Sequence, residues 1–215
     1  MTSKKGLLKR SRLYLVLDAK SCADGKKIRR LIRAEAVDII QLRVKNSPKI
    51  EILKKALRLK GLTEKEKVIF IVNDCADIAK ISGADGVHIG RSDITIGRAR
   101  KLLGRDKIIG KTCRNLRQIL AAKTQGADYV SLGPVFPSAT KSGITPLGLA
   151  FLKKIEPRKL GLPLFAIGGI NSSNLEAVLA GGINRIAACA AICKSAKPLA
   201  AAKKLKAQLK QKEKR

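Results

Sequence analysis

The sequence has no tryptophan, two tyrosines, four phenylalanines and a single histidine in 215 residues. Proteins use aromatic side chains to stack the bases of single-stranded nucleic acids, so a stacking platform is poorly supplied here. Acidic residues are also scarce, with 16 Asp and Glu against 46 Lys and Arg and a formal net charge of +30. This charge predicts nonspecific, salt-sensitive binding to RNA or DNA. Because the cations are dispersed over most predicted helices, no specific nucleic-acid partner is expected.

Long apolar runs are absent too. None approaches the roughly 20 residues that cross a membrane, so no membrane partner is expected. The cysteines are odd in number, scattered and without CxxC spacing (Cys22, Cys75, Cys113, Cys189 and Cys193). This pattern argues against a disulfide framework or a zinc site and favours a reducing compartment, so a cytoplasmic location is expected. The oligomeric state stays open, and a homo-oligomer is compatible with the sequence.

Hydrophobic residues make up 45% of the chain, enough for a sizeable core, and the length suits one domain. Eight short, continuously apolar runs alternate with helical patterns, as in parallel strands that are buried on both faces. We predict an α/β fold, a single-domain (β/α)8 TIM barrel over residues 13–202, with a basic N-terminal arm over 1–12 and a basic C-terminal helix end and tail over 203–215. The predicted strands are 13–18, 37–43, 68–72, 86–89, 107–112, 129–132, 164–167 and 185–189.

An internal repeat supports a ring of four (βα)2 units. A turn-then-strand pattern introduces the second, fourth, sixth and eighth predicted strands, and an Asp or Asn stands in each turn. These turns enter the strands at the bottom face of the barrel, whereas chemistry is expected at the opposite ends. Asp38, Asp85 and Asp128 are therefore predicted to be structural.

Two carboxylates follow neighbouring predicted strands. Asp74 comes directly after the third strand, beside Asn73, and Asp93 follows the fourth. Successive strand ends of a parallel sheet lie on one rim, so we expect these acids to face a common ligand. Magnesium is usually held by one or two carboxylates together with substrate phosphates and water. On so basic a chain the pattern predicts a Mg²⁺ cofactor that bridges to a phosphorylated substrate.

Polar side chains also follow the second predicted strand. Strand alternation points Gln41, Arg43 and Lys45 towards the barrel mouth. Two inward-facing cations are costly without an anion, which favours phosphate binding over an exposed salt-bridging role.

Further phosphate-binding groups follow the sixth, seventh and eighth strands. The loop after the sixth strand supplies hydroxyls and a cation from Ser138, Thr140 and Lys141. Gly169 and the pair Cys189 and Ala190 match the common barrel phosphate site. That site alone is not specific, since many unrelated barrels share it.

Four motifs occur in one order and spacing: IVND at 71–74, GADGVHIGRSD at 83–93, SLGPVFPSATKSG at 131–143 and AIGGI at 166–170. Over about residues 13–192 the chain resembles the thiamine-phosphate synthase family. The resemblance implies a transferase that joins 4-amino-2-methyl-5-hydroxymethylpyrimidine diphosphate to 4-methyl-5-(2-phosphooxyethyl)thiazole, giving thiamine phosphate and pyrophosphate. In the family mechanism pyrophosphate leaves first, and the thiazole nitrogen captures the pyrimidine carbocation.

The resemblance also implies roles for the rim residues. Asp74 and Asp93 match the Mg²⁺ ligands of the family. We expect Arg43, Lys45 and Lys141, with Mg²⁺, to stabilise the leaving pyrophosphate by electrostatics, without a nucleophilic side chain. The implied substrate-binding residues are Gln41, Arg43, Lys45, Asn73, Thr112, Ser138, Thr140, Lys141, Gly169, Cys189 and Ala190.

Some positions depart from the family pattern. Arg91 stands where relatives usually have Gln, Arg185 where they have Gly, and Ala190 where they have Ser. If the serine hydroxyl makes a contact, its loss at Ala190 would cost roughly 1 kcal/mol. His88, the single histidine, lies between apolar neighbours, and a structural role is favoured over an acid–base role.

Two alternatives stay open. The thiazole tautomerase branch of the family has a His where this chain has Pro134 and tends to lose the paired metal acids, so Pro134 with Asp74 and Asp93 favours the synthase. A non-catalytic, basic nucleic-acid-binding barrel would not need the rim residues to be intact. Mixing both substrates with Mg²⁺ and assaying thiamine phosphate separates all three hypotheses.

Overall fold

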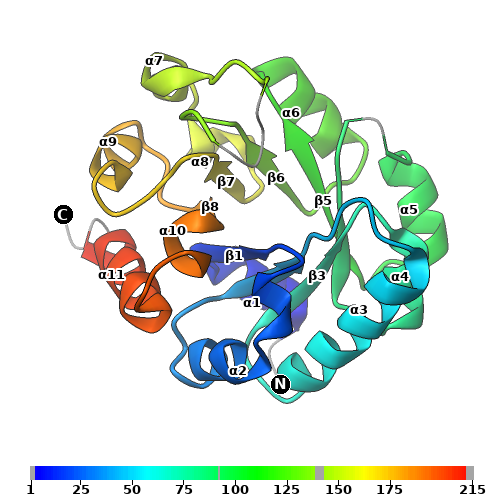
Figure 1. The fold of residues 1–215 in the computed structure, drawn as a ribbon. Coiled ribbons are helices and arrows are strands. Elements are labelled where there is room, and N and C mark those ends of the chain that lie inside the picture. The colour runs from blue at the N-terminus through cyan, green and yellow to red at the C-terminus, as the bar shows by residue number, and fades with distance from the viewer. Residues whose placement is uncertain (1–2, 92, 139–142, 212–215) are drawn as a thin grey trace.

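Eight parallel strands form a closed barrel in our computed structural model, which describes residues 3–91, 93–138 and 143–211 (Figure 1). The strands pair in chain order, and the last closes on the first. The predicted (β/α)8 TIM barrel is confirmed, and each predicted strand is present with ends within two residues. The strands are β1 (Leu13–Leu17), β2 (Ile39–Leu42), β3 (Ile69–Asn73), β4 (Gly86–Ile89), β5 (Ile108–Cys113), β6 (Tyr129–Leu132), β7 (Leu164–Ile167) and β8 (Ile186–Ala188).

Helices surround the barrel, and their apolar faces pack on the outer side of the strands. The short helices α7, α8 and α10 were not predicted. No helix in the described part of the chain is long and apolar enough to span a membrane. The helices are α1 (Lys4–Arg10), the 3-10 helix η1 (Ser21–Ala23), α2 (Gly25–Arg33), α3 (Lys49–Thr63), α4 (Ala76–Ile81), α5 (Ile96–Leu103), α6 (Leu116–Thr124), α7 (Gly148–Lys153), α8 (Pro157–Leu160), α9 (Leu175–Ala180), α10 (Ala190–Cys193) and α11 (Pro198–Gln211).

The segment before α9 caps the helix. Asn171–Ser173 is typical of a helix cap in the sequence, and the structure places it in a turn directly before α9, which begins at Leu175. The side chain of Asn171 accepts a hydrogen bond from the Ser173 N–H (2.9 Å), and that of Asn174 accepts one from the Asn171 N–H (2.8 Å). These reciprocal bonds are those of a capping box, and the Leu175 N–H donates to the Asn171 carbonyl (3.0 Å).

The barrel interior is filled by aromatic rings. Tyr14, Tyr129 and Phe165 are fully buried, with the Tyr129 and Phe165 ring centroids 5.7 Å apart in an edge-to-face contact. The packed interior leaves space for ligands at the mouth of the barrel, where the carboxyl ends of the strands meet.

The repeated acids lie at the bottom face and are structural, as predicted. Asp38 accepts hydrogen bonds from the backbone N–H groups of Arg12 and Leu13, at 2.8 and 2.9 Å. Asp85 accepts one from Phe70 N–H, and Asp128 one from Ile109 N–H, each at 2.8 Å. Each acid therefore satisfies the backbone at the start of a strand.

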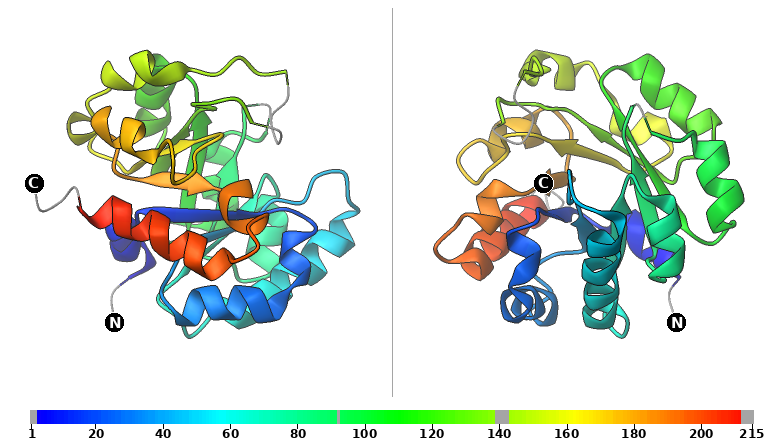
Figure 2. Two further views of the ribbon diagram at one scale, coloured as in Figure 1. Left: turned by 60° about the vertical axis from the view of Figure 1, so that its left-hand side comes forward. Right: turned by 45° about the vertical axis from the view of Figure 1, so that its right-hand side comes forward.

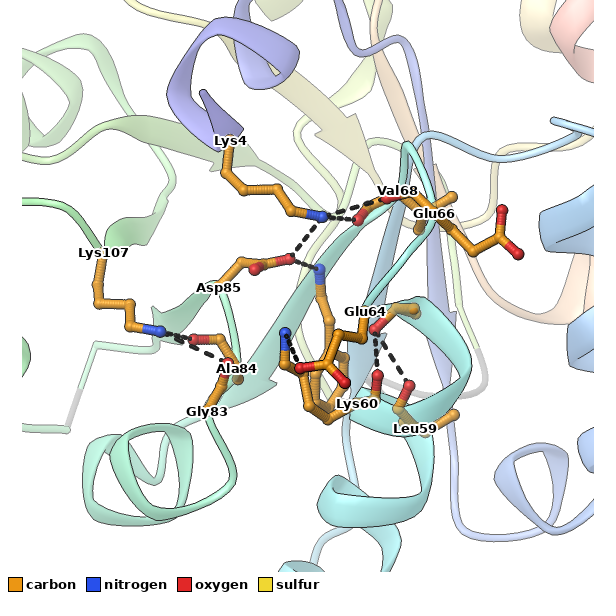
Figure 3. Close-up of polar contacts among 12 residues, drawn as sticks. Lys4, Leu59, Lys60, Glu64, Glu66, Val68, Gly83, Ala84, Asp85 and Lys107 are labelled. Carbon is orange, nitrogen blue, oxygen red and sulfur yellow. Dashed lines mark hydrogen bonds and ion pairs between the residues drawn. The ribbon is translucent and has the colours of Figure 1, made fainter. Parts of the chain in front are cut away.

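Helix α1 covers this bottom face. Its Lys4 donates to the Val68 carbonyl (2.6 Å) and pairs with Asp85 (3.3 Å), as Figure 3 shows. Lys5 pairs with Asp128 at 2.9 Å, and Leu8 is buried. The segment expected to be a basic arm thus contains a helix that packs on the barrel.

The C-terminal helix packs on the same molecule. Helix α11 runs through residue 203, the expected start of the C-terminal helix end and tail, and lies beside α2 in both views of Figure 2. Lys206 of α11 pairs with Asp38 at 2.7 Å. Arg185 also lies at the bottom, where it donates to the Lys9 carbonyl (2.9 Å), so its side chain is directed away from the barrel mouth.

Candidate active site

Two adjoining pockets open at the mouth of the barrel. The larger, about 500 Å³, lies over β2 to β5, and the smaller, about 270 Å³, lies over β7, β8 and the start of α10. The pockets share one wall, made by Val16, Arg43, Ile167 and Ala187. A ligand in one pocket would therefore lie next to a ligand in the other.

The larger pocket holds a pair of carboxyl groups. Asp74 follows β3 in a left-handed backbone conformation (φ 62°), held by a hydrogen bond from its N–H to the His88 carbonyl (2.8 Å). Asp93 follows β4, and its Oδ2 accepts a hydrogen bond from the Gly90 N–H (2.5 Å). Asp74 and Asp93 both line this pocket, and they lie close enough for the charge of Asp93 to act on Asp74.

The pKa of Asp74 is raised to about 6. Burial is the largest cause, followed by the hydrogen bond and the negative charge of Asp93, while Lys45 and Arg43 oppose the shift. Two carboxyl groups this close cannot both ionise readily unless a cation lies between them. Their oxygens fit a hard divalent cation that takes its remaining ligands from water or phosphate. In the described residues no group of three or more His, Cys, Asp or Glu could hold a metal by itself.

Cations line the same pocket opposite the acids. Arg43 and Lys45 follow β2, with Gln41 on the same side, whereas Val44 between them is buried on the other side. The N–H of Arg43 donates to the Leu17 carbonyl (2.8 Å), which fixes the backbone at the strand end. This arrangement suits an anion more than an isolated salt bridge.

The mouth contains two further cations whose place in the site was not predicted from the sequence. Arg91, whose direction the sequence left open, lines the larger pocket. Arg114, directly after β5, also lines it and donates to the Thr145 carbonyl (2.6 Å). The signal that could have found Arg114 is its position at a strand end on the rim, one residue beyond Cys113.

Lys111 of β5 was also not predicted to take part in the site. Its Nζ donates to the Gly90 carbonyl (2.6 Å), and the Gly90 N–H is the group that donates to Asp93. Lys111 therefore holds the turn that positions one carboxyl group of the pair.

A buried polar network forms the floor of the larger pocket. The two ring nitrogens of His88 contact the Tyr129 hydroxyl (3.0 Å) and the Thr112 hydroxyl (2.8 Å). The Tyr129 hydroxyl contacts that of Tyr14 (2.8 Å), which accepts a hydrogen bond from Gln41 (2.6 Å). Burial raises the pKa of both tyrosines, so they stay protonated. The network thus orients Gln41 and Thr112, and His88 has a structural place in it.

The smaller pocket is a cradle of glycine backbone. Gly168 and Gly169 have positive φ angles of 104° and 66°, and a Cβ on Gly169 would lie 2.5 Å from the Pro137 carbonyl oxygen. No other residue type fits there without strain. Cys189 and Ala190 complete the cradle at the start of α10.

The loop after β6 connects the two pockets in sequence. Among its described residues, Ser138 lines the smaller pocket and Ile144 lines the larger one. Thr140 and Lys141, both expected to bind substrate, lie outside the described residues. Asn73, Thr112 and the other expected binding residues lie in one pocket or the other.

Fold and mouth together define a (β/α)8-barrel protein with a polar site of cations and carboxyl groups at the carboxyl ends of its strands. The sequence model of the family described as thiamine monophosphate synthase matches residues 13–192. The chain belongs to this family.

Individual relatives agree with this assignment. The chain is 38% identical over 179 residues to the thiamine-phosphate synthase of Clostridioides difficile, covering 82% of this chain and 84% of the relative. It is 42% identical over 165 residues to that of Gloeobacter violaceus, but covers only 48% of the relative's length. The chain thus spans about half the length of some relatives.

Solved structures share the architecture. The thiamine phosphate pyrophosphorylase from Pyrococcus furiosus superimposes with a TM-score of 0.82 at 30% identity, covering 96% of this chain and 98% of that protein. A 3-hexulose-6-phosphate synthase superimposes with a TM-score of 0.66 at 24% identity, which shows a shared fold alone.

Proposed function

We propose that the protein is a thiamine-phosphate synthase, which joins the pyrimidine diphosphate to the thiazole phosphate and releases pyrophosphate. The observation that carries the proposal is the pair of adjoining pockets with a common wall at Arg43. One pocket offers carboxyl groups and cations to a diphosphate, and the other offers a glycine cradle to a second phosphate. The reacting carbon and nitrogen would then meet above the shared wall.

Asp74 and Asp93 are proposed to bind Mg²⁺ together with the diphosphate. The raised pKa of Asp74, caused in part by the charge of Asp93, supports this, since a divalent cation would offset the repulsion between the two carboxyl groups. When bound, Mg²⁺ supplies positive charge to the departing pyrophosphate. Lys111 would hold the Asp93 turn in place through Gly90.

Arg43, Lys45 and Lys141 are proposed to stabilise the leaving pyrophosphate. The negative charge of the leaving group grows as the bond to the pyrimidine carbon breaks, so cations already in position lower the barrier without rearranging. The first two line the larger pocket beside the acids, which supports this role. Departure of pyrophosphate with the bonding electron pair leaves a pyrimidine carbocation, and the thiazole nitrogen then captures it.

The two substrates are proposed to divide the remaining residues between the pockets. Gln41, Asn73 and Thr112 would bind the pyrimidine, because they lie on the floor and rim of the larger pocket. The hydroxyls of Ser138 and Thr140, with the backbone at Gly169, Cys189 and Ala190, would bind the thiazole phosphate. All five cysteines are free thiols, which supports the proposal that the protein works in the reducing cytoplasm.

The test is formation of thiamine phosphate from both substrates and Mg²⁺, measured by chromatography. Wild type should turn over, and Asp93→Asn should lower turnover by orders of magnitude without lowering the unfolding midpoint. Asp77→Asn is the matched control, because Asp77 is an acid on α4 that pairs with Lys49 outside the mouth. Near-normal turnover of Asp93→Asn would refute the metal assignment. A wild-type protein that only interconverts thiazole tautomers would refute the synthase.

A further inference from the structure

Helix α2 presents a strongly cationic face to solvent. Five of its nine residues are cations and none is acidic: Lys26, Lys27, Arg29, Arg30 and Arg33. Its apolar residues Ile28, Leu31 and Ile32 are buried against the barrel. The cations are all exposed, so the charge is directed to solvent.

Most cations of α2 have no carboxylate partner, in contrast to the lysines of the neighbouring helix α3. On α3, every lysine has a carboxylate within 3.7 Å: Lys49 with Asp77, Lys54 and Lys55 with Glu51, and Lys60 with Glu64. On α2, in the part of the chain that the structure describes, only Lys27 has such a partner, Asp24 at 3.7 Å. The positive charge of α2 is therefore not neutralised within the protein.

A groove runs along each side of α2. The groove against α11 and the segment before it has a volume of about 660 Å³, and Asp24 is its single acidic lining residue. Its cations are Lys26, Lys27, Arg30, Lys197 and Lys203.

The second groove lies between α2 and α3 and has a volume of about 410 Å³. Its charged lining residues are Lys26, Arg29 and Arg58, with no acid. The guanidinium of Arg58 reaches the first turn of α2, since a Cβ on Gly25 would lie 2.6 Å from its Nη2. Three helices thus contribute cations to one continuous surface.

We propose that this surface binds the phosphodiester backbone of nucleic acids without reading their sequence. The α2 surface consists of Lys26, Lys27, Arg29, Arg30, Arg58, Lys197 and Lys203. Five cations of α2 occupy about 10 Å of helix axis at ~1.5 Å per residue, a density of the same order as the charge per ~1.7 Å of duplex DNA. No aromatic or amide side chain lines either groove, so the bases have no partner there.

A nucleic acid fits this surface better than a membrane does. Membrane-surface helices insert an apolar face between lipids, whereas the apolar residues of α2 are already buried in the protein. The surface also shares no residue with either pocket at the barrel mouth. Binding there is therefore independent of the proposed synthase reaction.

The experiment compares two triple variants with the same change in net charge. The first reverses three cations of the α2 surface, Lys26→Glu, Arg29→Glu and Arg30→Glu. The control reverses three exposed cations of α7 and α8 and the residues between them, Lys153→Glu, Lys154→Glu and Arg158→Glu, at the opposite side of the barrel in Figure 1. Binding of a fluorescently labelled, mixed-sequence RNA of 20 nucleotides is measured by anisotropy over a range of salt concentrations.

The α2 variant should bind RNA at least about tenfold more weakly than wild type, and the slope of log affinity against log salt should fall by about 2, for three lost contacts at ~0.7 each. The control variant should keep its affinity within about threefold and keep its slope. Synthase activity of both variants should match wild type, and their unfolding midpoints should match each other at every salt concentration. If the charge-reversed α2 variant does not fold, the Gln triple at the same positions replaces it.

An equal loss of RNA affinity in both variants would mean that binding depends on net charge alone, and the proposal would be wrong. Unchanged RNA binding by the α2 variant would also overturn it. Vesicles containing an anionic phospholipid are tested in parallel. If the α2 variant loses vesicle binding but keeps RNA binding, the surface serves a membrane and not a nucleic acid.

Discussion

Asp74 combines a strained backbone with a carboxyl group that resists ionisation. Its φ of 62° lies in the left-handed region, which Asp and Asn tolerate better than most residues. Its pKa of about 6 means that the folded protein holds this proton more tightly than the unfolded chain does. Protonated Asp74 therefore stabilises the folded protein at low pH, and this stabilisation is lost as the pH rises through about 6.

Asp74→Asn should stabilise the protein when no metal is present. Above pH 7 the gain should be about 1 kcal/mol, a value reduced for solvent screening because the carboxyl is only partly buried. Below about pH 3 the gain should vanish, since the wild-type acid is then largely protonated in both states. Urea unfolding in EDTA at both pH values measures this, and synthase activity should be lost.

Asp77→Asn is the control for this experiment. The pKa of Asp77 is lowered, chiefly by its hydrogen bond with Lys49, so its replacement should not stabilise the protein at neutral pH. An Asp74→Asn variant that is less stable than wild type at pH 7.5 would contradict the view that the ionised carboxyl pair destabilises the fold when no cation is bound.

Lys111 provides a second test at the scale of single residues. Lys111→Met removes the bond to the Gly90 carbonyl and frees the turn that positions Asp93. Loss of one charged hydrogen bond, about 1.5 kcal/mol, should lower activity about tenfold and raise the Mg²⁺ concentration needed for half-maximal rate. Rates measured over a Mg²⁺ titration give both values.

Lys107→Met is the matched control, because it removes a similar lysine–carbonyl bond next to the opposite end of β5. Lys107 donates to the Ala84 carbonyl (2.6 Å) near the bottom face, as Figure 3 shows. Its loss should lower stability but leave the Mg²⁺ dependence unchanged. Equal Mg²⁺ dependence in the two variants would show that Lys111 does not position the acid.

At the scale of elements, the strands and helices are connected at the bottom by repeated acids. Three of the four (βα)2 units use an Asp to accept a backbone N–H at a strand start, and Asn184 stands at the fourth position. Lysines of α1 and α11 pair with these acids, so the two terminal helices are joined to the barrel through the same residues.

Asp85→Ala should cost about 3 kcal/mol of stability, because it leaves the buried Phe70 N–H without an acceptor and Lys4 without its acid. The free energy of unfolding in urea measures the loss. Asp106→Ala, an exposed acid on a neighbouring loop, should change stability by less than about 0.5 kcal/mol. Similar values for both variants would mean that the acid has no role in holding the strand starts.

At the scale of the whole molecule, the charge of +30 opposes the compact state. Raising salt from 0.01 M to 0.15 M shortens the screening length from about 30 Å to about 8 Å. The melting temperature should therefore rise by at least about 2 °C, equivalent to ~1 kcal/mol. Scanning calorimetry at both salt concentrations measures it.

In both charge-reversed triple variants, salt should raise the melting temperature less than in wild type. The reduction should be the same in the two variants, because self-repulsion depends on net charge. A melting temperature that falls with added salt would show that the ion pairs at the bottom face outweigh the repulsion. This whole-molecule effect contrasts with RNA binding, which is expected to depend on where the three charges lie.

The barrel, its eight strands and its repeat were predictable from the sequence, because apolar periodicity and turn residues act between neighbours along the chain. The placing of Asp74, Asp93, Arg43 and Lys45 on one rim follows from the same local rules, since parallel strands end on the same side. The cap at Asn171 was predictable for the same reason, because its hydrogen bonds join residues within four positions of one another.

Tertiary structure alone decided which side chains meet. The contact between Lys111 and Gly90, the pairing of Lys4 with Asp85 and the wall that Arg43 shares between two pockets join segments far apart in the sequence. These distances depend on the register and closure of the barrel, which no local pattern encodes. The sequence determined which groups reach the mouth, and the closed barrel determined that the two acids lie together in one pocket with Arg43 and Lys45.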